Sequence, residues 1–96
     1  MAEALHLLRL AQASPDVWVE LPGSAGRLGV VQVTRPQPGG DGACWYVCLG
    51  GTLILDLPHG DFVQLRVGES AAVPDGQAHT LTPVRQATVL RTRTGP

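Results

Sequence analysis

Glycine and proline interrupt this chain at short intervals after Pro15, and short runs of apolar and β-branched residues lie between the interruptions. Runs of this kind, bounded by turn residues roughly every 8 to 12 positions, are typical of a β-sandwich or β-barrel. The sequence therefore predicts an all-β fold. We expect strands at residues 17–21, 28–34, 44–49, 52–57, 62–67, 70–73, 78–82 and 87–93.

The residues before Pro15 follow a helical pattern instead. Apolar residues recur at spacings of three and four between residues 2 and 13, which predicts one short amphipathic helix. Pro15 ends it, because proline disfavours the helical conformation of the residue before it. A chain of 96 residues has room for a single domain, so we expect the helix within residues 1–14 and a β-barrel over residues 15–96. Segment 36–42, with two prolines and three glycines, is expected to be a loop.

The charge pattern excludes several classes of function. Seven basic and eight acidic residues give a formal net charge of -1, and no run of like charges occurs, so a nucleic-acid partner is not expected. Every basic residue is arginine, which excludes Schiff-base chemistry and a phosphate-loop lysine. No apolar stretch approaches the roughly 18 residues that span a membrane. We therefore expect no membrane partner and a cytoplasmic location.

The two cysteines, Cys44 and Cys48, lie on one expected strand. Four residues at about 3.3 Å each would place their Cα atoms about 13 Å apart, beyond the roughly 7 Å that a disulfide can bridge. We expect two buried, unpaired thiols. A reactive or metal-binding thiol is the alternative interpretation.

The segment from Gly68 to His79 combines turn and strand signals in a specific order. Gly68 permits a chain reversal, Pro74 and Gly76 make the next reversal, and His79 then lies on the following expected strand. The spacing of glycine, five residues, proline, one residue, glycine, two residues and histidine resembles the second conserved motif of the cupin superfamily. Where that motif continues with an asparagine, this chain has Pro83.

The first cupin motif is only half present. The sequence from Cys44 to Gly51, followed by an apolar strand, resembles the end of that motif. Counting back from Gly51 places Cys44 where cupins have a glutamate, and the usual histidine pair falls within residues 37–40, which contain no histidine. The resemblance covers roughly residues 28–93. It implies a double-stranded β-helix, that is, a conical jelly roll with a pocket between its two sheets, and a homodimer.

A candidate pocket follows from strand alternation together with this resemblance. Side chains alternate along a strand, so Cys44, Tyr46 and Cys48 share one face. In cupins the glutamate position points into the barrel, which implies that these three side chains also point inward. Gln77 and His79 are expected to point the same way from the other motif strand. These five residues are our candidate ligand-binding set.

A metal site would need at least three suitable protein ligands. The inferred pocket offers His79 and, less readily, Cys44. The remaining histidines, His6 and His59, are expected on the helix and at the tip of a hairpin, away from the barrel mouth. We therefore predict no metal ion and no cofactor.

Three interpretations of function remain open. The first is a metal-free module that binds a small polar or carbohydrate-like molecule in the barrel. The second is a small enzyme of the isomerase, epimerase or metal-dependent oxygenase type, in which His79 works with Tyr46 or Cys44. The third is a homodimeric scaffold whose surface matters more than its pocket. In the plainest interpretation, the ring nitrogens of His79 simply bond to backbone groups or to Tyr46.

Overall fold

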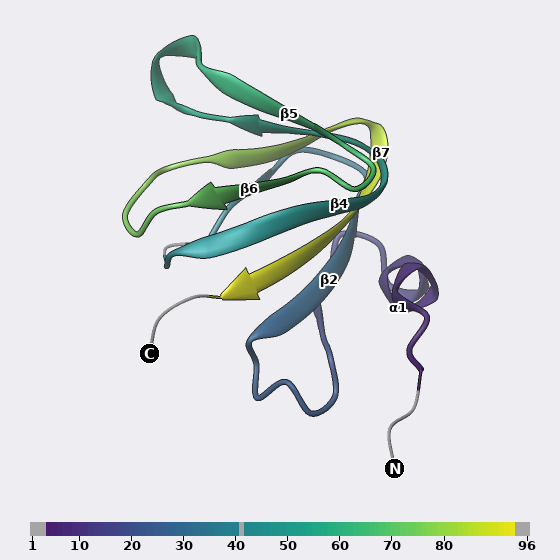
Figure 1. Ribbon diagram of the computed structural model, residues 1–96. Helices are drawn as coiled ribbons and strands as arrows, with labels where there is room; N and C mark the ends of the chain where they lie inside the picture. Colours follow the sequence, from purple (N-terminus) through teal and green to yellow (C-terminus); the bar gives the residue numbers. More distant parts are fainter. Residues whose placement is uncertain (1–3, 41, 94–96) are drawn as a thin grey trace.

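The computed structural model describes residues 4–40 and 42–93 of the chain. Within these residues one short helix precedes a set of antiparallel strands (Figure 1). The elements are α1 (Leu7–Ala13), β1 (Val19–Glu20), β2 (Leu28–Val33), β3 (Gln37–Pro38), β4 (Cys44–Asp56), the 3-10 turn η1 (Pro58–Gly60), β5 (Phe62–Arg66), β6 (Ser70–Val73) and β7 (Thr80–Arg93). The predicted all-β class with one leading helix is confirmed.

Two long strands, β4 and β7, take part in both layers of the molecule. The first half of β4 pairs with β6 and with the second half of β7, which also pairs with β2. The second half of β4 pairs with β5 and with the first half of β7, beside β3. Figure 1 shows both strands curving sharply between these halves. Two antiparallel layers therefore face each other, as in a jelly roll.

The bend coincides with an irregular point in the β4–β7 ladder. Gly51 pairs with Ala87 and Leu53 pairs with Pro83, so one residue of β4 lies opposite three residues of β7. Such a bulge bends a strand without ending its pairing. Proline, which has no backbone N–H to donate, is tolerated beside it because the regular ladder is interrupted there. The sequence signals at these points led us to expect two separate strands in place of each long one. Eight strands were expected, and the described residues form seven.

The main core fills the space between the two layers. Its buried residues come from β2, β4, β5, β6 and β7 and include Tyr46, Leu53 and Leu81. A second cluster lies on the outer side of β2, where Ala11 of α1 packs against Val30. The helix thus covers an apolar patch outside the barrel and leaves the interior to the strands. Burying these apolar side chains is the main driving force for this arrangement.

Several local predictions need correction. The helix spans Leu7–Ala13, shorter than the expected 2–13, because the His6 side chain caps it by accepting a hydrogen bond from the Arg9 N–H; residues 1–3 lie outside the described residues. The predicted loop 36–42 contains the short strand β3, which pairs with β7. Among the described residues, no helix is long and apolar enough to cross a membrane.

Candidate functional site

A buried tyrosine and histidine form the centre of the candidate site. The Tyr46 hydroxyl lies 2.8 Å from His79 Nε2, and both side chains are buried. Tyr46 comes from the first half of β4, whereas His79 directly precedes β7 and is one residue short of the strand on which it was expected. The antiparallel pairing continues there, because the Gly39 N–H donates to the His79 carbonyl at 3.0 Å. The fold therefore brings the two motif segments together across the barrel interior.

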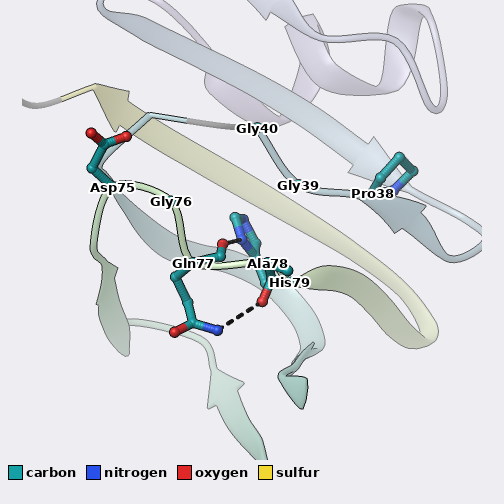
Figure 2. Close-up of a pocket in the computed structure, with 8 residues that line it drawn as sticks. All are labelled: Pro38, Gly39, Gly40, Asp75, Gly76, Gln77, Ala78 and His79. Atoms are coloured by element: carbon teal, nitrogen blue, oxygen red, sulfur yellow. Dashed lines mark hydrogen bonds between the residues drawn. The ribbon is translucent and has the colours of Figure 1, made fainter.

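The hydrogen bonds of His79 define its tautomer. Nδ1 lies 2.8 Å from the Gln77 carbonyl oxygen (Figure 2), which can only accept, so Nδ1 carries the proton. In the neutral ring Nε2 is then an acceptor, and the Tyr46 hydroxyl donates to it. Both ring nitrogens are thus occupied, as the plainest interpretation of this histidine expects. Gln77 contributes its backbone to the ring, while its side-chain amide donates to the Ala78 carbonyl at 3.0 Å.

Gly39 lies directly against the His79 ring. A Cβ atom at this position would fall 1.9 Å from His79 Nε2 and 2.2 Å from Cδ2. No side chain fits there unless the imidazole moves, because such separations are far inside van der Waals contact. Gly39 belongs to the segment where the resemblance places the missing histidine pair. The space available to a ligand side chain in that segment is therefore taken by the His79 ring itself.

The two cysteines are buried and free, so the prediction that they form no disulfide is confirmed. Both point inward with Tyr46, while Trp45 on the same strand is exposed, so the predicted alternation holds. The Cys48 thiol is directed at the Gly50 and Gly51 carbonyls, and burial raises its pKa. Cys48 therefore lies beside the bend in β4 and away from His79. Cys44 lies beside the Tyr46 hydroxyl, since it helps to raise the pKa of that group.

A cleft of about 530 Å³ opens beside this cluster. One wall is the segment Pro38–Gly40, and the other is the turn from Asp75 to Ala78, with His79 between them (Figure 2). Glycine and backbone atoms form much of the lining, and the polar side chains come from Asp75, Gln77 and His79. Of the five residues predicted to bind a ligand, Gln77 and His79 line the cleft. Tyr46, Cys44 and Cys48 lie deeper in the barrel.

The residues around His79 do not suit a metal ion. Its Nε2 accepts the Tyr46 hydroxyl and its Nδ1 donates to a carbonyl, so neither nitrogen has a free lone pair directed at the cleft. Across residues 4–40 and 42–93, no three histidine, cysteine or acidic side chains gather at one point. His6 caps the helix, and His59 lies exposed in η1, so neither can complete a set of ligands at the cleft.

Sequence reasoning missed two residues, Arg91 and Trp18, that lie close to Tyr46. The Arg91 guanidinium stacks on the Trp18 ring, with its central carbon 4.1 Å from the ring centroid. Arg91 pairs with Tyr46 across the β4–β7 ladder, and Trp18 lies 6.5 Å from Tyr46 between ring centroids. Because side chains two residues apart on a strand share a face, the apolar Val89 would have predicted that Arg91 points inward. Trp18 also packs against the main core.

The buried phenol leads to a prediction about alkaline pH. Tyr46 is the single tyrosine of the chain. Its pKa lies above the ordinary value of 10.0, first because burial desolvates the phenolate and next because the Cys44 side chain lies beside it. The neutral phenol is thus favoured by folding, so its contribution to stability is complete below about pH 10 and is lost as the pH rises beyond that value.

We expect tyrosinate absorbance to stay absent well above pH 10 in the folded protein and then to appear together with unfolding. Absorbance and tryptophan fluorescence measured in one pH titration would show this. A denatured sample should ionise with a pKa near 10. Ionisation of the native protein at that same pH, with the fold intact, would contradict the buried position of the phenol.

Comparisons with known proteins address the fold. No protein-family model matches the sequence, and no curated protein matches it significantly. Solved structures do match. Protein NMB1881 from Neisseria meningitidis aligns with a TM-score of 0.77 at 16% identity, over 96% of this chain and 100% of that one.

Two further structures carry descriptions of their own. A cupin-2 domain protein from Shewanella frigidimarina aligns with a TM-score of 0.62 at 17% identity, over 71% of this chain and 69% of that one. A hydroquinone 1,2-dioxygenase, crystallised with Cd²⁺ and 4-hydroxybenzonitrile, aligns with a TM-score of 0.77 at 19% identity, over 95% of this chain and 72% of that one. At such identities the likeness concerns architecture alone. This chain therefore has the jelly-roll fold of a small cupin.

Proposed function

We propose that this chain binds a small polar molecule, of a carbohydrate-like kind, in the cleft between Pro38–Gly40 and Asp75–His79, without a metal ion. The observation that carries the proposal is the cleft itself, in which the polar side chains of Asp75 and Gln77 stand among glycine and backbone atoms, beside a fully hydrogen-bonded His79. Its volume of about 530 Å³ lies within the range of small-molecule sites. Exposed backbone groups and the side chains of Asp75 and Gln77 would orient hydroxyl or amide groups.

Amide chemical shifts of labelled protein would test this binding. Titration with sugars, polyols, hydroxy acids and small amides should give saturable shifts at Gly39, Gly40, Gly76 and Ala78. Ala78→Phe would fill the cleft and should abolish the shifts. Ala72→Phe places the same ring on an exposed position of β6, outside the cleft, and should leave them unchanged. Equal loss in both variants, or shifts centred elsewhere, would refute this site.

The proposal that the cleft binds its ligand without a metal ion can be tested separately. Protein purified without chelators should contain no stoichiometric transition metal by elemental analysis. A bound metal that disappears in His79→Ala would overturn this part of the proposal, since the hydrogen bonds of His79 leave it no free nitrogen. The homodimer implied by the resemblance also stays a prediction, which sedimentation velocity at micromolar concentration would test.

Acid–base catalysis is the second candidate, because the 2.8 Å contact between Tyr46 and His79 is a pair through which a proton can move. The carboxylate that usually orients a catalytic histidine is replaced here by the Gln77 carbonyl. Turnover of a cleft ligand that is lost in His79→Gln, while binding persists, would favour the enzyme. Binding with no turnover would favour the binding module.

A further inference from the structure

Arg91 stands out near the cleft, because it is a partly buried cation stacked on an aromatic ring. It lies on the inner face of β7, two residues after the buried Val89, and its guanidinium rests on the Trp18 ring at 4.1 Å. Stacking of this kind orients the planar guanidinium while leaving its N–H groups free at the edge. Burial also lowers its pKa, although arginine remains protonated in proteins.

The surroundings of Arg91 offer it little compensation. Within the described residues, the ion pair found joins Arg35 and Asp16, on the surface and not at Arg91. Burial and the neighbouring Arg93 lower the Arg91 pKa, and each acts more strongly than any group that raises it; those groups are Tyr46, Cys44 and Glu20. The side-chain hydrogen bonds of the described residues also leave the Arg91 guanidinium unused. A charged group removed from water in this way is normally matched by an anion.

The guanidinium also reaches the edge of the cleft. One of its terminal nitrogens, Nη1, lies 3.8 Å from the position that a Cβ of Gly40 would take, and Gly40 lines the cleft. Because residue 40 is glycine, no side chain stands between the cation and the open space there. Arg91 pairs with Tyr46 across the β4–β7 ladder, and its charge lowers the pKa of the Tyr46 hydroxyl in part. The cation therefore lies beside Gly40 in one wall of the cleft, and the Asp75 turn forms the other wall.

We propose that Arg91, held by Trp18 beside Gly40, binds an oxyanion group of the ligand that enters the cleft. This inference rests on the proposed function, which it narrows to small organic acids or phosphate esters. A guanidinium matches carboxylate and phosphate oxygens through two parallel N–H donors, which an ammonium group cannot reproduce. The uncharged part of the ligand would lie against the Asp75–Ala78 turn.

The two tryptophans make a direct test possible. The Trp18 indole lies under Arg91, whereas Trp45 is exposed on the outer face of β4 and serves as an internal reference. We would titrate labelled protein with acetate, inorganic phosphate or uncharged acetamide at constant ionic strength and record both indole resonances. Acetate or phosphate should shift the Trp18 resonance saturably and leave the Trp45 resonance unchanged. Acetamide should shift neither resonance. The stronger of the two anions identifies the class of oxyanion.

Variants separate the Arg91 site from general charge effects. Arg91→Met should weaken anion affinity about tenfold or more, the usual effect of removing a charged hydrogen-bond partner. Arg85→Met removes the same charge from an exposed position of β7 and should change nothing. Arg91→Lys, which keeps the charge without the planar fork, should bind more weakly than the native protein. Each titration is repeated in Asp41→Asn, which removes the carboxylate that follows Gly40 in the sequence.

The outcomes distinguish this inference from the proposed function. If neither anion shifts Trp18 in the native protein or in Asp41→Asn, or if Arg91→Met binds as well as the native protein, the oxyanion site is wrong. The cleft proposal would still stand if sugars or amides shift Gly76 and Ala78. If anions bind at Trp18 while no molecule shifts the Asp75–Ala78 turn, the oxyanion site stands and the cleft proposal fails.

Discussion

Replacing Gly51 with alanine is expected to lower the free energy of unfolding by about 2–5 kcal/mol. Gly51 has a φ of 70°, in the left-handed region, which costs a residue with a Cβ about 1–2 kcal/mol. The new Cβ would also fall 2.1 Å from the Gln86 carbonyl oxygen. That oxygen belongs to the backbone of the bulge where β7 bends, so it cannot move without distorting the corner, which adds about 1–3 kcal/mol.

Gly23→Ala is the matched control for the Gly51 substitution. Gly23 has a φ of 79°, and its added Cβ would meet nothing within 4 Å. It should therefore show the conformational cost alone, about 1–2 kcal/mol. Urea unfolding followed by tryptophan fluorescence would give both values. If the two variants lose the same stability, the close approach of the two long strands at Gly51 is not as described.

Replacing Gly39 with alanine should displace the His79 ring and cost about 2–4 kcal/mol of folding stability. The Cβ would overlap Nε2 and Cδ2 of the imidazole. To make room, the ring must leave both the buried Tyr46 hydroxyl and the partly buried Gln77 carbonyl, each at 2.8 Å. Each buried polar group left without a partner costs about 1–3 kcal/mol. The cleft beside Gly39 should lose its ligand shifts in the same variant.

A double-mutant cycle identifies the cause of this effect. In His79→Ala the ring is absent, so adding Gly39→Ala to that background should cost about 0.5 kcal/mol or less. Gly42→Ala, nearby in the same connection, places a Cβ in open space at an ordinary φ and should be close to neutral. Additive losses from Gly39→Ala and His79→Ala would show that the two residues do not touch.

Local pattern was a sound guide to the faces of the strands. The alternation of Cys44, Tyr46 and Cys48 follows from backbone geometry, and all three are buried. The turns at Gly68 and Gly76 were also predictable, because both require the positive φ that they have, 87° and 78°. The resemblance of the Gly68–His79 segment supplied the type of barrel, which alternation and turns alone leave open between sandwiches and barrels.

The continuity of the long strands was not predictable in the same way. Glycine at positions 50 and 51 and proline at position 83 are local signals for a break. In the structure the chain bends at these points and keeps its pairing on both sides, because the partner strand bends with it. Likewise Gln37–Pro38 joins the sheet only because β7 lies beside it. A propensity for turns describes the local backbone and carries no information about a partner strand.

By itself the sequence determined most of the strand segments, which side chains share a face of a strand and where most turns lie, since these depend on neighbours in the chain. Only the tertiary structure decided the chemistry of the site. Tyr46 and His79 are 33 residues apart, and their hydrogen bond, together with the one to the Gln77 carbonyl, decides which imidazole nitrogen carries the proton. The stacking of Arg91 on Trp18 likewise joins two residues that are far apart in the sequence. Alternation assigns a side chain to a face, but its partner across the barrel depends on how two bent sheets close on each other.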